Sequence, residues 1–409
     1  MTQYSTLRQA APQVSLMAVM IFFSMYSRMV MSPLLVFIQD ALAIGPAAAT
    51  RLFLPQSISY SGAMLLSGFL AGRVGHRRTI ATSGAVLGFG LIVVALGNSL
   101  LVMHLGFGLI GVGAGLYPPS GVASLTGMVR PEIRGKAIAI HEVGPNSAFV
   151  VAPLIVAAGV LLGNWRWVPA LSGVVAIAMA FTFDRTSVAG GIKADRPQLH
   201  NLKRLFAQAE FWAITAFFAV AASSTVGVFS ILPTFLISSE GYPVGVANTI
   251  ISVSRVSGIA MLFVSGVLVD RIGVRKLIGG VLTITGVLTV GIGALTGNAM
   301  LLAVALQPII IAAFFPAAVS AIADIGPPEI RGIAVSFMIP MVNIIASGVF
   351  PTLMGFLTER ELVRAGFVGL GMTMLATLVL LPVLPDHRPI PPGPGKSPDL
   401  HQRSTDSPS

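Results

Sequence analysis

The chain has 409 residues, of which 55% are hydrophobic and only 10% are charged, whereas a soluble domain carries about 25% charged residues. It contains no cysteine, which excludes a disulfide framework and a thiolate metal site, and we expect neither a metal nor a cofactor. The net charge of +10 would favour nucleic acid in a soluble protein, but these cations lie between apolar runs, so no nucleic-acid partner is expected.

Apolar runs long enough to cross a bilayer fill most of the chain. Residues 79–129 contain no Asp, Glu, Lys or Arg, which leaves room for two spans of about 20 residues each. The predicted fold class is therefore an all-α membrane protein with twelve transmembrane helices in two six-helix bundles. The predicted spans are 14–38, 47–71, 79–97, 100–126, 136–162, 166–184, 209–238, 244–269, 277–297, 299–323, 333–357 and 363–384.

Four regions are expected from this pattern. The first bundle should occupy residues 1–184 and the second residues 209–385. Residues 185–208 hold paired glycines, a proline and several cations, which is typical of a linker, and the Pro- and Ser-rich residues 386–409 should form a disordered tail. Lys and Arg concentrate in the linker, the tail and alternate loops, so both termini are predicted to be cytoplasmic. The expected location is a plasma membrane, such as a bacterial inner membrane.

Two motifs occur twice at almost the same separation. Residues 68–78 (GFLAGRVGHRR) correspond to residues 266–276 (GVLVDRIGVRK), and the sequence PEIRG occurs at 131–135 and again at 328–332. Both pairs are explained by two similar six-helix halves in tandem. Transporters with such repeats bind their substrate between the halves, near the midplane of the bilayer.

The first of these motifs resembles the Gly-x-Leu-x-Asp-Arg-x-Gly-x-Arg-Arg signature of the major facilitator superfamily, found between helices 2 and 3 and again between helices 8 and 9. The resemblance implies that fold and a function in transport. It also implies gating roles for residues of the two loops, which are Gly68, Gly72, Arg73, Gly75, Arg77, Arg78, Gly266, Asp270, Arg271, Gly273, Arg275 and Lys276. Gly72 stands where the family has Asp, whose carboxylate can pair with neighbouring arginines and hold one state of the transporter, an interaction called the latch below. The first loop should therefore have a weaker latch or take its carboxylate from another residue.

Two arginines fall in the middle of predicted spans, where a charge is costly and marks a functional site. Arg28 and Arg255 are expected to face the central cavity and bind an anion, because a guanidinium can donate two parallel hydrogen bonds to a carboxylate. The alternative is structural: each arginine caps helix carbonyls or pairs within its own half. Tyr26, Tyr117 and Asn343 are expected to be polar groups of the same cavity.

Cations on helices 1 and 8 are similar to the arrangement in monocarboxylate and oxalate carriers of the superfamily. In the monocarboxylate carriers an Asp lies one turn before the helix-8 Arg, and this chain has Ile251 there. His141 and Glu142 are candidates for proton coupling, since His titrates near neutrality, or else form an interfacial pair.

These features predict a secondary transporter of a small organic anion, with a carboxylate the expected class, acting as a symporter or antiporter. We expect a monomer, with protons as a possible coupling ion, and no enzyme activity, because the chain has no Walker sequence. One alternative is a proton-coupled exporter of apolar or cationic compounds, because Gly144-Pro145 partly resembles the helix-5 Gly-Pro signature of proton-coupled antiporters. A second is a non-transporting membrane sensor or assembly factor.

Overall fold

The computed structural model describes residues 4–187, 202–323 and 328–384, except for several side chains between 257 and 270 and those at 323 and 328–333. In this part of the chain the helices form twelve long rods, and the all-α, twelve-helix fold is confirmed. Most of the predicted linker, the tail, the surroundings of Gly266 and the side chain of Asp270 lie outside what the structure describes.

Six rods come from the first half of the chain, and two of them are interrupted. Their helices are α1 (Leu7–Met29) with α2 (Met31–Leu42), α3 (Pro46–Thr50) with α4 (Phe53–Val74), α5 (His76–Leu96), α6 (Leu100–Met128), α7 (Pro131–Val160) and α8 (Trp167–Thr186).

The second half repeats the plan after a short helix, α9 (Leu202–Phe206). Its rods contain π-helical turns, labelled η2 to η4, and a final 3-10 turn, η5. They are α10 (Ala209–Ala222) with η2 (Ser223–Gly227), α11 (Val228–Thr234) and η3 (Phe235–Ser239), α12 (Val244–Ile272), α13 (Val274–Ala294), α14 (Gly297–Ala312) with α15 (Phe314–Ala323), α16 (Pro328–Ile344) with η4 (Ile345–Val349) and α17 (Phe350–Glu359), and α18 (Val363–Thr377) with η5 (Leu378–Val383).

Ten of these rods are long and apolar enough to cross a bilayer, as judged on the described residues. The rod that contains α4 falls short because polar residues such as Gln56 and Tyr60 dilute its apolar character, whereas α12 was judged only over Val244–Val256, an apolar stretch shorter than a span. Both rods lie against the opposite half of the molecule, α4 beside α16 and α12 beside α7. The polar residues of α4 and α12 therefore belong to helices at the interface between the halves.

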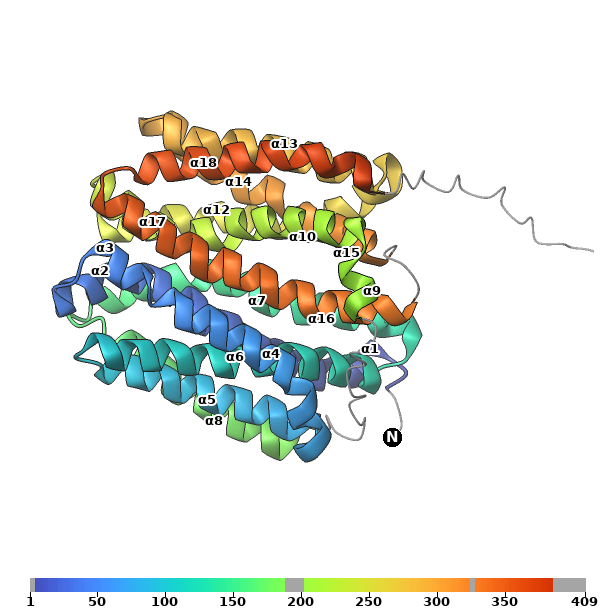
Figure 1. The fold of residues 1–409 in the computed structure, drawn as a ribbon. Helices are drawn as coiled ribbons and strands as arrows, with labels where there is room; N and C mark the ends of the chain where they lie inside the picture. Colours follow the sequence, from blue (N-terminus) through green and yellow to red (C-terminus); the bar gives the residue numbers. More distant parts are fainter. Residues whose placement is uncertain (1–3, 188–201, 324–327, 385–409) are drawn as a thin grey trace, which may run out of the picture.

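The two halves form separate groups of helices that meet along a central seam. Figure 1 shows α5, α6 and α8 of the first half on one side and α13, α14 and α18 of the second half on the other. The contacts between the halves run from α2 to α11, from α3 to α17, from α4 to α16 and from α7 to α12. Any site between the halves must be built from these helices.

The two signature loops have nearly the same backbone. Gly75 has φ +86° and ψ 156°, and Gly273 has φ +83° and ψ 154°. Only glycine adopts this region readily, which explains why each loop has a glycine at this point. The agreement extends the sequence repeat to the conformation of the chain.

Prolines determine where the first span breaks and where it contacts the second half. Pro33 has no N–H to offer the carbonyl of Met29, and the rod breaks at Val30, between α1 and α2. Pro233 likewise leaves the carbonyl of Phe229 without a helical partner. The hydroxyl of Ser32 donates to that carbonyl across the seam, at 2.8 Å.

Close packing of α6 depends on its glycines, as a row of small residues in a membrane helix predicts. A Cβ at Gly111 would collide with the backbone of Gln56, and one at Gly115 with the backbone of Tyr60. A Cβ at Gly113 would collide with Leu87 of α5. Gly108 makes no such close approach. These contacts fix α4, which carries Tyr60, at a short distance from α6.

Candidate functional site

Arg28 reaches from the first half of the molecule into the second. Its Nη2 donates to Oδ1 of Asn343 in α16 at 2.6 Å and to Oγ of Ser347 in η4 at 3.0 Å. Its guanidinium carbon lies 4.1 Å from the ring centroid of Tyr60, at the distance of a cation–π contact. Two of the residues predicted to line the cavity, Arg28 and Asn343, are thus in direct contact.

Arg255 is also buried, and fewer of its donors are occupied. Its Nη2 donates to the carbonyl of Thr225 at 3.0 Å, while its Nε is buried and has no hydrogen-bond partner. The guanidinium carbon lies 5.1 Å from the ring centroids of both Phe149 and Phe229. This leaves a cation held between two aromatic faces, with donors free for a ligand.

A small cavity adjoins Arg255 at the seam between the halves. Its volume is about 60 Å³, and α7 contributes Asn146 and Phe149 to its wall. Gly258 of α12 and Pro308 of α14 form part of the opposite wall. The cavity therefore lies between helices of both halves, where a twofold repeat of this kind places a substrate.

Neither Arg28 nor Arg255 has an ion-pair partner among the described residues. The ion pairs among the described residues are Arg77–Asp184, His141–Glu142 and Arg364–Glu240. A buried cation without a counter-charge is costly, and in a membrane-spanning segment it marks a functional site. Both guanidinium groups therefore meet the electrostatic requirement for binding an anion.

The surroundings of the two arginines are alike. Arg28 donates to a residue of the π-helical turn η4, and Arg255 donates to a residue of the π-helical turn η2. Asn343 contacts Arg28, and Asn146, its counterpart 197 positions earlier, lines the cavity beside Arg255. Single π-helical turns inside α-helices are rare and often found at functional sites. The surroundings of each arginine thus include one asparagine from the opposite half and one π-helical turn of the second half.

A polar stripe on α12 was not predicted from the sequence. Asn248, Ser252 and Arg255 follow one another at helical spacing, and all three are buried. Both amide atoms of Asn248 and the hydroxyl of Ser252 lack a hydrogen-bond partner, as does Nε of Arg255. The signal was present in the sequence, because polar residues at i, i+4 and i+7 in an apolar helix share one face.

The two tyrosines predicted to line the cavity have other partners in this structure. The hydroxyl of Tyr26 lies 2.9 Å from Oγ of Ser172 in α8, within the first half. The hydroxyl of Tyr117 donates to the carbonyl of Met17 in α1 at 2.9 Å. A role for either tyrosine in substrate binding remains a prediction.

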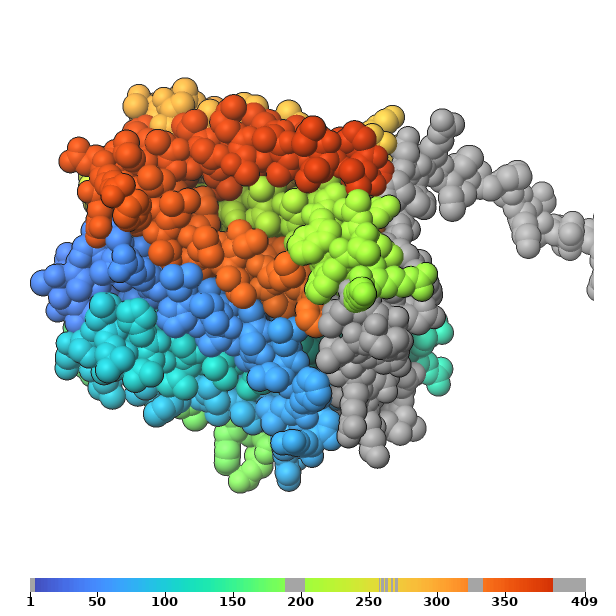
Figure 2. Space-filling model, in the orientation of Figure 1, coloured from blue at the N-terminus to red at the C-terminus, as the bar shows by residue number. Residues whose placement is uncertain are grey.

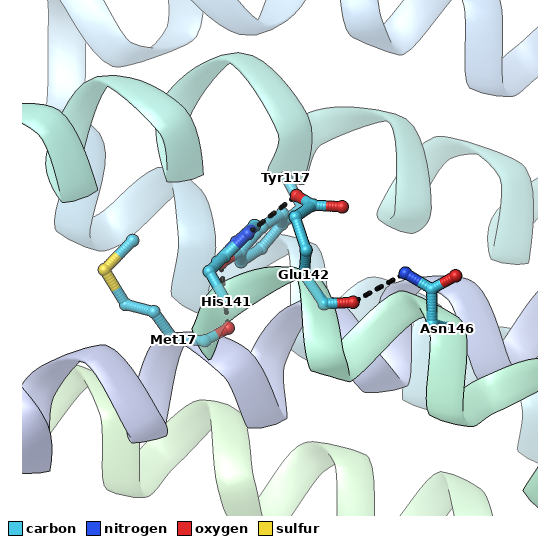
Figure 3. Close-up of polar contacts among 5 residues, drawn as sticks. All are labelled: Met17, Tyr117, His141, Glu142 and Asn146. Atoms are coloured by element: carbon cyan, nitrogen blue, oxygen red, sulfur yellow. Dashed lines mark hydrogen bonds and ion pairs between the residues drawn. The ribbon is translucent and has the colours of Figure 1, made fainter. Parts of the chain in front are cut away.

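His141 and Glu142 belong to a compact hydrogen-bonded cluster with Tyr117 (Figure 3). The imidazole is buried and stacks on the ring of Tyr117, with Nε2 3.0 Å from the phenol oxygen. Its Nδ1 lies 3.1 Å from Oε1 of Glu142, whose side chain is 53% exposed. The cluster therefore links an accessible carboxylate to the backbone of α1 through two buried aromatic groups.

The first signature loop obtains a carboxylate from another helix. Nε of Arg77 lies 3.3 Å from Asp184, near the end of α8. Gly72 is exposed, and a Cβ added there would meet no atom within 4 Å. Arg73, Arg78, Arg271 and Lys276 are exposed, and Arg275 is half-buried. The gating roles of these loop residues remain predictions.

Comparisons with known proteins agree with this architecture. A sequence model of the Major Facilitator Superfamily matches residues 17–295 and 245–406. A search of curated protein sequences gave no significant match.

Solved transporter structures share the fold. A bacterial homolog of the human lysosomal transporter Spinster, inward-facing and unoccupied, aligns with a TM-score of 0.70 at 17% identity, over 93% of this chain and 96% of that chain. The peptide transporter POT aligns with a TM-score of 0.76 at 15% identity, covering 93% and 98% of the two chains. The nucleoside transporter NupG aligns with a TM-score of 0.74 at 14% identity, covering 90% and 98%.

Proposed function

Because the chain belongs to the Major Facilitator Superfamily and is a transmembrane transporter, we propose that it carries a small organic anion, a carboxylate, by alternating access. The observation that carries the proposal is Arg255, a buried cation with no counter-charge in the described part of the chain and with an unpartnered Nε, at a cavity between the halves. A carboxylate would accept hydrogen bonds from the unoccupied guanidinium donors and neutralise the charge. The two phenylalanine rings that flank the guanidinium would exclude water and strengthen this attraction.

Arg28 supports the same proposal with a different role. Its bonds to Asn343 and Ser347 cross the seam, so a rocking motion of the halves must break or rearrange them. An anion that approached Arg28 would compete with Asn343 for the same donors. Arrival of the substrate would in this way loosen a contact between the halves, which couples binding to the conformational change.

A contact between α3 and α17 supports a structure that is closed at one face. Glu359 of α17 accepts a hydrogen bond from the backbone N–H of Ala47 in α3 at 3.0 Å. This contact lies at the end opposite the signature loops, as the span order requires, while the bond from Ser32 to α11 lies about one turn beyond Arg28, nearer the middle of the span. We propose that this is the external end, that both termini are cytoplasmic and that the protein is a monomer of the plasma membrane.

Protons are the proposed coupling ion, and the cluster of Tyr117, His141 and Glu142 is the proposed proton site. Tyr117 has a single hydroxyl proton, which it donates either to the carbonyl of Met17 or to Nε2 of His141. When Tyr117 donates to Met17, Nε2 of His141 must carry a proton, because it then donates to the phenol oxygen. A further proton is shared between Nδ1 of His141 and the carboxylate of Glu142. When His141 is neutral with its proton on Nδ1, Tyr117 turns to Nε2 and releases α1, the helix that carries Arg28.

Other charged groups lie on the helices around His141. On α7 itself they are Glu132, Arg134 and Lys136 in the first two turns. On α1, which packs against α7, they are Arg8 and Arg28, and on α12, which also packs against α7, they include Arg255 and Arg271. A second candidate function, proton-coupled export of apolar or cationic compounds, is favoured by the same cluster, because Glu142 is accessible and carries a carboxylate that a cation could bind.

Binding and transport by the purified full chain test the proposal. The melting temperature is measured with a panel of carboxylates, a neutral sugar and an organic cation, and the best ligand is then followed into proteoliposomes. A carboxylate should stabilise the wild-type protein but not Arg255→Ala, while Arg166→Ala, at a helix end, should respond like the wild type. Stabilisation by the cation alone, lost in Glu142→Gln, would refute the anion proposal and support the exporter.

A further inference from the structure

A second cavity, an open groove, lies at another part of the seam, away from Arg255. It is about 340 Å³ in volume and is lined by residues of α3 and α4 in the first half and of η4 and α17 in the second, namely Ala47, Arg51, Leu54, Val349, Thr352, Leu353 and Phe356. Ligand pockets in proteins usually have about 300–1,000 Å³ and mostly apolar walls. In Figure 2 the blue surface of the first half and the orange surface of α17 meet along this seam.

The walls of this groove suit a hydrocarbon chain. Val349, Leu353 and Phe356 are exposed by 48%, 52% and 40%. In a transmembrane protein such side chains contact lipid. Thr352 supplies a hydroxyl, but this already donates to the carbonyl of Gly348 at 2.8 Å. The groove thus offers apolar surface and little to hydrogen-bond a polar substrate.

Two cations stand at the end of the groove, near the membrane surface. Arg51 is exposed and forms part of the wall. Arg360 follows Phe356 by one turn, and its guanidinium carbon lies 4.0 Å from the centroid of that ring. Within the described part of the chain neither arginine has a carboxylate partner. Glu359 lies nearby, but its carboxylate accepts from the N–H of Ala47.

We propose that this groove binds an anionic phospholipid of the surrounding leaflet. One acyl chain would lie along Leu54, Leu353 and Phe356, and the phosphate would lie between Arg51 and Arg360. The arginines match the charge of the headgroup, and the apolar walls match the chain. Because the walls come from both halves, a bound lipid stabilises the arrangement in which α3 and α17 are in contact. The inference depends only on the protein being in a membrane and not on which substrate it carries.

Lipid retention by the purified full chain tests the inference. The protein is reconstituted in an equimolar mixture of phosphatidylglycerol and phosphatidylcholine, extracted in mild detergent, and the retained lipids are counted by native mass spectrometry. Phosphatidylglycerol should be retained preferentially by the wild type. The double variant Arg51→Gln/Arg360→Gln should lose about 30-fold in phosphatidylglycerol affinity, from two basic residues at about 1 kcal/mol each.

Two further variants separate the groove from general surface charge. Arg166→Gln removes one cation at a loop on the same end of the molecule, where its Nη2 donates to the carbonyl of Gly97, and should retain lipid like the wild type. Leu353→Trp fills the groove at an exposed position and should release the lipid while both arginines remain. Equal retention of the two lipids by the wild type overturns the inference. So does unchanged retention in the double variant or in Leu353→Trp, or a loss in Arg166→Gln as large as in the double variant.

Discussion

Replacing Arg255 tests the anion site most directly. One guanidinium donor is engaged by the carbonyl of Thr225, so Nε and the remaining N–H groups are available for a carboxylate. A hydrogen bond to a charged group contributes about 1.5–3 kcal/mol. Loss of two such bonds in Arg255→Ala should raise the Kd of the carboxylate by roughly two to four orders of magnitude. Arg255→Lys should recover little of the loss, because an ammonium cannot reproduce the planar fork.

The stability of the ligand-free protein provides the control for this experiment. Arg255→Ala removes an unpaired buried cation, which stabilises the folded protein. It also removes the cation–π contacts with Phe149 and Phe229, which destabilises the folded protein by about 1–2 kcal/mol. The melting temperature without ligand should therefore change little, while titration calorimetry records the change in Kd. If Arg255→Ala unfolds the protein, or if it folds and binds carboxylate normally, Arg255 is a structural residue and the reasoning fails.

Other variants extend the test to the rest of the machinery. Arg28→Ala should weaken carboxylate binding. If Arg28 and Arg255 share one ligand, the double alanine variant should lose less binding free energy than the sum of the two single losses, as measured by calorimetry. Additive losses would mean separate sites. Gly72→Asp has room for its side chain and should draw the signature-loop ends together, as a shorter distance between spin labels on this cysteine-free chain would report; an unchanged distance would remove Gly72 from the latch. His141→Gln should flatten the dependence of transport on a pH gradient without abolishing carboxylate binding, whereas a retained gradient dependence would exclude the cluster from coupling. A protease site placed after residue 409 should be cut only from the cytoplasmic side, and external cleavage would contradict the predicted topology.

Much of the fold could be predicted because hydrophobic length reports membrane spans directly. The span predicted at 277–297 corresponds to Val274–Ala294, and Gly75 and Gly273 of the two signature loops share one backbone conformation, as the sequence repeat implies. The break at Val30 and the π-helical turns were not foreseen. The break at Val30 follows from Pro33, which has no N–H for the carbonyl of Met29, while the bond between Ser32 and the carbonyl of Phe229 joins residues far apart in the sequence.

The candidate site was only partly predictable for the same reason. A charge in an apolar run stands out, so Arg28 and Arg255 could be named, but the contact between Arg28 and Asn343 spans 315 positions and needs the packed structure. Helix geometry could have predicted that Tyr26 points away from Arg28, because the two residues are two apart on one helix and such residues point to nearly opposite sides. Asn248 and Ser252 could have been named from their spacing relative to Arg255.

The π-helical turns have a genetic consequence. Such a turn holds one more residue than the α-helical turn it replaces, so it corresponds to a single-codon insertion in an otherwise regular span. Deleting one residue from η2 would join α10 and α11 into one α-helix as far as η3, with nearly the same hydrophobic length, which the membrane would still accept. Everything downstream in that span would then rotate by about 100°, and the backbone of residues 229 and 230 would turn away from Ser32. Ser32 would then lose its hydrogen bonds to the carbonyls of Phe229 and Ser230, so Ser32→Ala should lower the melting temperature of the full-length chain and change that of the deletion variant little.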